Sequence, residues 1–307
     1  MQEIFIGEAI KRRRLELKLT QEKLCEGICE PITISRLENG RQSPSRNLVN
    51  ALLERLDMPS DRYYALVSKD ELEIEDLQAK ITYWDIRFEQ TQNVQARVEA
   101  IKTHEALQRK MKLEDRISQQ LILRSLAILG KEDGPFSPEE KQEMLFRAIR
   151  LTAPNFDVSH FEDGLYTANE IKIINQLALN YERLGDQSTT IDILHRLSAY
   201  MEQHCRCDRA SKARQTMVLF NYANNLVSVG EYGRALLVAK KGRDICIECG
   251  HYLFFPELLA VMAEAESFLG NAKDSEELYK QAFYMAKAIG HERNAQMIFE
   301  QMKRRDE

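Results

Sequence analysis

Three short segments in the C-terminal half of the chain repeat at nearly even spacing, each with a glycine after a large apolar residue. The glycines are Gly185, Gly230 and Gly270, so the spacings are 45 and 40 residues. An alanine stands seven residues before each glycine, preceded by a larger residue: Leu177-Ala178, Tyr222-Ala223 and Met262-Ala263. Such a period is typical of stacked helix pairs that bury their apolar faces against one another. The pattern therefore predicts an α-helical solenoid.

The composition favours helices along the whole chain. Among 307 residues, only 13 are glycine and 7 are proline, which is too few for a turn-rich β fold. Apolar periodicity predicts helices over about 70–91, 94–111, 115–129 and 137–150, ahead of the clear repeats. Residues 292–305 are expected to form a capping helix. The fold class that we predict is all-α.

The first 40 residues carry the start and stop signals of three short helices. In the first, over residues 6–17, Ile6, Ile10 and Leu17 are expected to face a core. Thr20 is a good N-cap for a second helix over residues 21–27, which would bury Leu24 and Cys25.

After a tight corner at residues 27–29, Pro31 suits the first turn of a third helix, which Asn39-Gly40 would end. There, Ile34 and Leu37 would point inward. The spacing of Leu48, Leu52 and Leu56 predicts a fourth helix, and residues 60–67 a short fifth one. We place a domain boundary near residue 68, giving domains over 1–67 and 68–307.

The N-terminal segment resembles the helix-turn-helix domain of phage repressors, the Cro/C1 or XRE class. The matching residues are Thr20-Gln21-Glu22-Lys23-Leu24, Ile34-Ser35-Arg36-Leu37-Glu38-Asn39-Gly40 and Ser43-Pro44-Ser45, within a resemblance that covers residues 5–58. Glu26-Gly27-Ile28-Cys29 is similar to a subgroup, the Rgg/PlcR-type (RRNPP) peptide-pheromone regulators. This resemblance implies a five-helix, lambda-repressor-like domain whose third helix enters the major groove of DNA.

The resemblance, with the chemistry of the outward side chains, predicts six DNA contacts. Ile32 and Thr33 are expected to read base edges, because an apolar tip senses a thymine methyl and a hydroxyl both donates and accepts. Gln21 is placed for a phosphate at a helix N-terminus. The remaining contacts are Ser35, Arg36 and Arg41. Arg14 either pairs with Glu38, as is common in this class, or binds DNA. Arg13 departs from the pattern, since the class usually has an apolar residue there.

The glycine repeats resemble tetratricopeptide (TPR) repeats, which implies a concave groove lined by the first helix of each pair. The groove residues in this register are Lys172, Asn175, Gln176 and Leu179, followed by Met217, Phe220, Asn221 and Asn224. A carboxamide offers both a donor and an acceptor, so it can match a peptide unit. The resemblance to the pheromone regulators implies a short peptide ligand. Asn180 and Asn225 occupy another pair of equivalent repeat positions, where the side chain could serve either packing between helices or ligand binding.

Cysteines and histidines cluster at two places, His204-Cys205-Arg206-Cys207 and Cys246-Ile247-Glu248-Cys249 with His251. A redox or metal role is conceivable. However, cysteines three residues apart on one helix do not form the compact knuckle of most zinc sites, and buried cytosolic thiols are common. We therefore predict no metal and no cofactor, and leave the roles of Cys205, Cys207, Cys246 and Cys249 open.

Other function classes find little support. The chain has no phosphate loop, no G-x-S-x-G and no H-E-x-x-H, so we expect no enzyme activity. It has no apolar run that resembles a signal peptide or a membrane span, so we expect a cytoplasmic protein. The formal net charge is −5, but residues 1–67 hold 11 Lys and Arg against 10 Asp and Glu, so the acidic excess lies downstream.

These features together predict a transcription regulator that binds an inverted-repeat operator in double-stranded DNA as a homodimer. Its repeats would bind an effector, foremost a short signalling peptide, and so control DNA binding. Two alternatives stay open. The repeats could be a scaffold for a protein partner, or the regulator could respond to a small molecule or to thiol oxidation.

Overall fold

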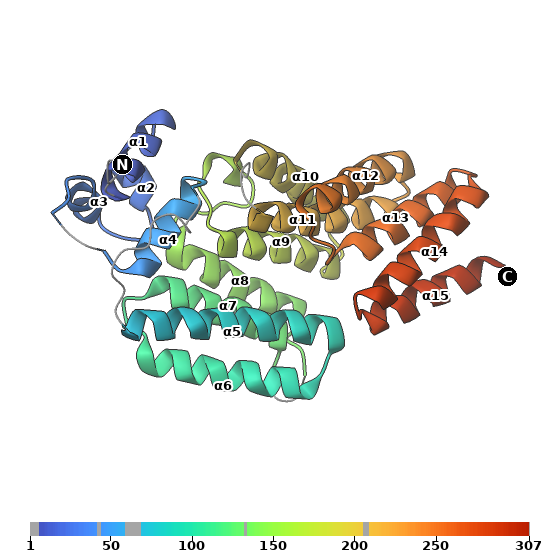
Figure 1. Ribbon diagram of the computed structural model, residues 1–307, viewed down its shortest axis with the longest axis horizontal. Coiled ribbons are helices and arrows are strands. Elements are labelled where there is room, and N and C mark those ends of the chain that lie inside the picture. Colours follow the sequence, from blue (N-terminus) through green and yellow to red (C-terminus); the bar gives the residue numbers. More distant parts are fainter. Residues whose placement is uncertain (1–5, 42–43, 59–68, 132–133, 205–208, 307) are drawn as a thin grey trace. The chain divides into compact units, whose positions relative to one another are not determined.

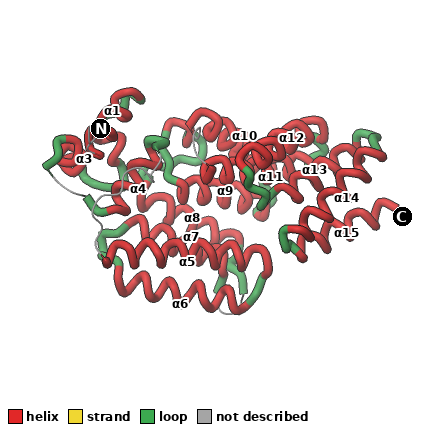
Figure 2. Tube along the Cα trace, viewed as in Figure 1, coloured by secondary structure: helices red, strands yellow, loops and turns green. Residues whose placement is uncertain are grey.

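Helices account for almost all of the regular structure in the computed structural model, which describes residues 6–41, 44–58, 69–131, 134–204 and 209–306. Those ranges hold no strand (Figure 2), and their one β-bridge joins Lys131 and Gly134. The chain forms two compact units, Met1–Leu177 and Ala178–Glu307. The predicted all-α fold is confirmed.

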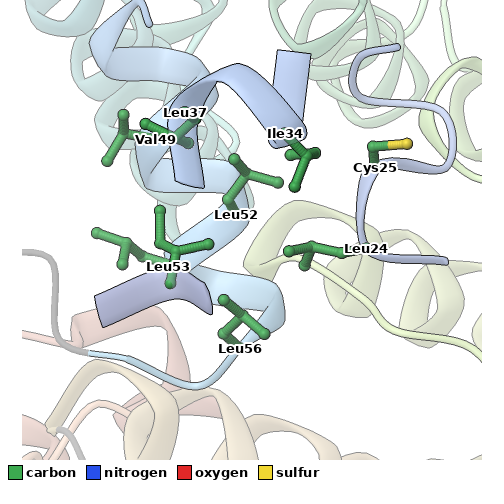
Figure 3. Close-up of a cluster of buried hydrophobic side chains, with 9 residues drawn as sticks. Leu24, Cys25, Ile34, Leu37, Val49, Leu52, Leu53 and Leu56 are labelled. Carbon is green, nitrogen blue, oxygen red and sulfur yellow. The ribbon is translucent and has the colours of Figure 1, made fainter. Parts of the chain in front are cut away.

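Unit 1 begins with four short helices, whose bounds are α1 Ile6–Glu16, α2 Gln21–Cys25, α3 Pro31–Glu38 and α4 Arg46–Arg55. Their apolar side chains converge on one core, drawn in Figure 3, which includes Leu24, Ile34, Leu37, Leu52 and Leu56. The core residues expected from periodicity are confirmed here, with one correction. Leu17 lies beyond the end of α1 and is 37% exposed, because the helix stops one residue before it.

The first helix uses polar contacts where an apolar residue is usual. The Nε of Arg13 donates to the carbonyl of Leu56 at 3.1 Å, and its Nη1 lies 3.2 Å from a carboxylate oxygen of Glu16. The aliphatic part of an arginine can cover apolar surface while its head stays polar. Arg13 thereby closes the corner between α1 and the end of α4.

Two antiparallel helix pairs follow in unit 1, with bounds α5 Lys69–Thr91, α6 Val94–Lys110, α7 Arg116–Leu129 and α8 Pro138–Thr152 (Figure 1). Ile81 of α5, Leu107 of α6, and Leu121 and Ile122 of α7 form one buried apolar cluster. After a 3-10 turn at Phe161–Asp163, α9 runs over Ala168–Arg183, and the division between the two units falls inside it. The four helices predicted between residues 70 and 150 are therefore present.

Unit 2 continues as helix pairs, with bounds α10 Gln187–His204, α11 Arg209–Ser228, α12 Tyr232–Cys249, α13 Phe255–Phe268, α14 Ala272–Ala288 and α15 Glu292–Asp306. A small, fully buried side chain recurs twelve residues after each repeat alanine, at Thr190, Ala235 and Ser275. The hydroxyls of Thr190 and Ser275 donate to the carbonyls of Ala178 and Ala263. Small residues at these positions let paired helices approach closely, as the TPR-like pattern predicts.

The repeat glycines end the first helix of each pair in a left-handed conformation. The φ angles of Gly185, Gly230 and Gly270 are 83°, 79° and 87°. Residues with side chains adopt this conformation at a cost, so glycine is preferred at such helix ends. The predicted fifth helix over residues 60–67 and the domain boundary near residue 68 lie outside the described residues.

Candidate functional site

The outward face of α3 carries a hollow beside the end of the helix. Its volume is ≈ 450 Å³, and it is lined by Ile32, Ser35, Arg36, Asn39 and Arg41. Four of these residues are predicted DNA contacts. Ile32 is 55% exposed although it is apolar, while Ile34 and Leu37 on the other side of α3 are fully buried. The solvent side of α3 therefore presents an apolar tip and Arg36, and Arg41 follows just after the helix.

The end of α3 is shaped so that Arg41 returns to the same side as Arg36. The side chain of Asn39 donates to the carbonyl of Ser35 at 2.7 Å, and the backbone N–H of Arg41 donates to the carbonyl of Arg36 at 2.8 Å. Gly40 between them has φ 68°. Asn39, which the sequence predicts only as a helix stop, therefore also lines the hollow.

The side chain of Gln21 is hydrogen-bonded to a buried ion pair between Arg14 of α1 and Glu38 of α3. Arg14 donates to both carboxylate oxygens of Glu38, at 2.6 and 2.8 Å, and to the carbonyl of Leu19. The amide of Gln21 donates to Glu38 at 2.7 Å. The hydrogen bond to Glu38 raises the pKa of Arg14. The expected pairing of Arg14 with Glu38 is thus present, and Arg14 has a structural role.

Thr33 lies one turn into α3 and is half-buried. Its backbone N–H donates to the carbonyl of Glu30 at 2.9 Å, which starts the helix. Thr20 caps α2, with its Oγ1 accepting from the N–H of Lys23 at 3.1 Å. The capping predicted from the sequence is confirmed, and it fixes where α2 begins.

Three predicted ligand contacts lie in the part of α9 that belongs to unit 1. Lys172 and Gln176 are half-buried, and Asn175 is 3% exposed. Burial raises the pKa of Asp85 in α5, and the ammonium of Lys172 is among the groups that oppose this shift. The Oε1 atom of Gln176 is buried and makes no hydrogen bond within the described residues. A buried amide oxygen of this kind is an acceptor that an incoming N–H can satisfy.

The other predicted ligand contacts lie in unit 2. Leu179, Phe220 and Asn221 are half-buried, and Asn224 is exposed. The ring of Phe220 stacks on Phe254 with 5.8 Å between centroids. By contrast, Asn225 is buried and its Oδ1 accepts from Gln187 at 2.7 Å, which is a packing contact between repeats.

The described residues contain no group of three or more His, Cys, Asp or Glu that could hold a metal ion. Burial raises the pKa of Cys246 to about 12, so at neutral pH this residue is a thiol and reacts slowly with oxidants. Its neighbour Cys249 donates to the carbonyl of Cys246. Cys205 and Cys207 lie outside the described residues.

A serine, a histidine and an aspartate meet in the interior of unit 1. The Nε2 of His104 lies 2.8 Å from the Oγ of Ser125, and that hydroxyl donates to Asp85. The serine proton therefore points to the carboxylate and not to the imidazole, which is the reverse of a catalytic triad. Arg124 pairs with Asp85 at 2.9 Å, and all four side chains are buried. The cluster is a structural polar core.

Comparisons with known proteins agree with this architecture. Residues 10–62 match the family model described as helix-turn-helix. PlcR of Bacillus thuringiensis, solved in complex with the peptide PapR7 and DNA, is similar over 96% of this chain and 98% of its own, with a TM-score of 0.60 and 18% identity. This chain shares its fold with PlcR. No curated protein sequence matches the chain significantly.

Two further solved structures have the same fold over nearly their full length. PlcR in its apo form has a TM-score of 0.55 at 16% identity and covers 96% of this chain and 98% of that one. ComR of Streptococcus vestibularis, in complex with its cognate signaling peptide XIP, has a TM-score of 0.52 at 17% identity and covers 96% of both chains. The expected likeness to PlcR-type regulators is confirmed for the fold.

The chain thus combines an N-terminal helix-turn-helix domain with TPR-like helical repeats. Within the described ranges, no helix has the length and apolar character needed to cross a bilayer.

Proposed function

We propose that this chain is a transcription regulator that binds double-stranded DNA through the outward face of α3. The observation that carries this proposal is the hollow lined by Ile32, Ser35, Arg36, Asn39 and Arg41. Arginine heads bind phosphates or the acceptor edge of guanine, and an exposed isoleucine suits a thymine methyl. Thr33 completes the base-reading end of the helix, and Gln21 lies at the start of α2.

A single helix-turn-helix domain contacts few bases, so one copy gives little specificity. We therefore infer that the regulator binds an inverted-repeat operator as a homodimer, with one α3 helix in each half-site.

The repeats are proposed to bind a short peptide. Gln176 supports this with an unsatisfied amide oxygen, and Asn221, Asn224 and Phe220 support it with exposed or half-buried carboxamides beside an aromatic surface. Carboxamides match backbone peptide groups, and apolar neighbours accept alternate side chains. PlcR and ComR, whose fold this chain shares, were solved with peptides. The remaining contacts in the proposal are Lys172, Asn175 and Leu179.

Helix α9 is the proposed route from ligand to DNA. It carries Lys172, Asn175 and Gln176, and two residues earlier it carries Glu170, which pairs with Arg55 of α4. A peptide that shifts α9 would thus act on a helix of the DNA-binding domain directly. Such control requires the peptide to bind with different affinity to two conformations of the protein that differ in the arrangement of the DNA-binding domains.

The DNA-binding proposal is tested by incubating fragmented genomic DNA with the purified full-length chain and sequencing the recovered fragments. Wild type is expected to enrich a palindromic site, and the Thr33→Ala/Arg36→Ala double variant is expected to lose that enrichment. Arg183→Ala removes an exposed arginine of α9 as the matched control and should bind like wild type. Equal recovery of the same fragments by the double variant would refute the role of α3.

A further inference from the structure

Glu257, in the first turn of α13, has a carboxyl group of which only one oxygen accepts a hydrogen bond within the described part of the chain. The Oε1 atom of Glu257 accepts a hydrogen bond from the side chain of Asn294 in α15, and the Nδ1 of His291 lies 3.7 Å from the same oxygen. The other oxygen, Oε2, is buried and has no hydrogen-bond partner among the described residues. The side chain as a whole is 14% exposed. Buried carboxylate oxygens in proteins are normally paired, so this one calls for an explanation.

The repeat register places Glu257 on the ligand-facing side of its helix. Gly230 and Gly270 are equivalent and 40 residues apart, so Glu257 corresponds to Met217 of α11. Met217 belongs to the same predicted face as Phe220, Asn221 and Asn224. The stacking of Phe220 on Phe254 shows that these faces of α11 and α13 meet at this level of unit 2. Phe254 is the N-cap residue of α13 and precedes Glu257 by three residues, so both belong to the start of that helix.

The surroundings of the carboxyl group suit a cation with an aliphatic stem. Burial raises the pKa of Glu257 to about 7, and the Asn294 hydrogen bond opposes that shift. A positive charge beside Oε2 would stabilise the ionised form and fill its empty acceptor position. The stacked rings of Phe220 and Phe254, the second of them at the N-cap of the same helix, offer both an apolar surface for methylene groups and a favourable face for a cation. A lysine or arginine side chain combines these two features, a cation and an aliphatic stem.

We propose that Glu257, with the Phe220–Phe254 pair, forms a subsite for a lysine or arginine side chain of the bound peptide. This inference rests on the proposed peptide-binding function and adds to it a specificity for basic peptides. Because Oε2 is buried, binding requires a change of side-chain rotamer at Glu257 or Phe254, which is a common adjustment at binding interfaces.

The test uses two pools of fluorescently labelled heptapeptides with capped ends. One pool has lysine at the central position and the other has norleucine, which has nearly the same shape and no charge; all other positions are drawn from uncharged residues. Apparent Kd values are measured by anisotropy for wild type, Glu257→Gln and Glu248→Gln. Glu248 is an exposed carboxylate on α12 and serves as the matched control for the loss of one negative charge.

Wild type and Glu248→Gln are expected to bind the lysine pool at least tenfold more tightly than the norleucine pool. Glu257→Gln keeps an acceptor for Asn294, so it should fold normally and bind the norleucine pool as wild type does, but without preference for lysine. Equal binding of both pools by wild type, or a lysine preference that persists in Glu257→Gln, would overturn the subsite and leave peptide binding intact. If wild type bound neither pool, both the subsite and the peptide proposal would be refuted.

Discussion

Arg55 of α4 and Glu170 of α9 form an ion pair inside unit 1, with 3.4 Å between Nη2 and Oε1. The side chains are 2% and 0% exposed. The same guanidinium donates to the carbonyls of Leu24, Glu26 and Thr152, at 3.1, 2.6 and 3.0 Å. One buried side chain therefore connects the end of α2, the end of α8 and the start of α9. The DNA-binding helices and the first repeat helices share a polar core.

Replacing Arg55 by methionine is expected to destabilise unit 1 strongly. The change removes the positive charge beside Glu170, which keeps its hydrogen bonds from Thr152 and Thr167, and it removes the arginine donor from three carbonyls. Breaking a buried pair from one side costs about 3–5 kcal/mol. Urea unfolding followed by the fluorescence of Trp84, the chain's single tryptophan and a residue of α5, measures the loss. In the double variant Arg55→Met/Glu170→Gln, the loss should be smaller than the sum of the single losses by about 1 kcal/mol or more. Strict additivity would show that the two side chains are not coupled.

Gly27 lies so close to α8 that no side chain fits. A Cβ atom added there would stand 1.7 Å from the carbonyl oxygen of Thr152, and the φ angle of 73° is itself unfavourable for other residues. Gly27→Ala should therefore cost at least about 2 kcal/mol. Gly185→Ala is the matched control, because its φ is 83° and nothing lies within 4 Å of the added Cβ. Both losses are measured by far-UV circular dichroism in urea. Equal losses would mean that the turn does not contact α8 in solution.

His104 makes the stability of unit 1 depend on pH. Burial lowers the pKa of its imidazole from 6.5 to about 4. Above pH 6.5 the imidazole is neutral in both the folded and unfolded states, so His104 does not lower the free energy of unfolding there. As the pH falls from 6.5 to 4, the unfolded chain binds a proton that the folded chain does not, so stability decreases by about 3 kcal/mol across that window.

His104→Gln should lose most of this acid sensitivity, because glutamine can donate to Ser125 and does not titrate. Urea midpoints measured at several pH values between 4 and 7 give the comparison. His160→Gln, at an exposed position, is the control and should keep the wild-type slope. A parallel pH dependence in His104→Gln and wild type would assign the sensitivity to other groups.

Local signals in the sequence were sufficient for the helices and for the repeat register. Thr20 caps α2 as its hydroxyl predicts, and Gly185 and its equivalents end helices where the left-handed conformation is needed. The outward position of Ile32 and Arg36 follows from the helical periodicity of α3, since Ile34 and Leu37 occupy the core.

Contacts between distant segments could not be predicted in this way. Arg55 and Glu170 are separated by 115 residues, and no local sequence pattern around either residue indicates that the two are in contact. Gly27 was expected in a tight corner, but its approach to Thr152 depends on how α8 packs. Glu257 was overlooked because a glutamate in a first turn ordinarily complements the helix dipole, and only burial reveals its unsatisfied oxygen.

The central claim is that a peptide bound by the repeats controls DNA binding by α3. The most direct test measures the Kd of the enriched operator duplex with and without a saturating peptide selected from the heptapeptide pools. Coupling free energies of about 1–3 kcal/mol correspond to changes of about 5- to 150-fold. For wild type we expect the operator Kd to change within this range, and by reciprocity the peptide Kd to change by the same factor when operator is added. A peptide that binds tightly and leaves the operator Kd unchanged would contradict it.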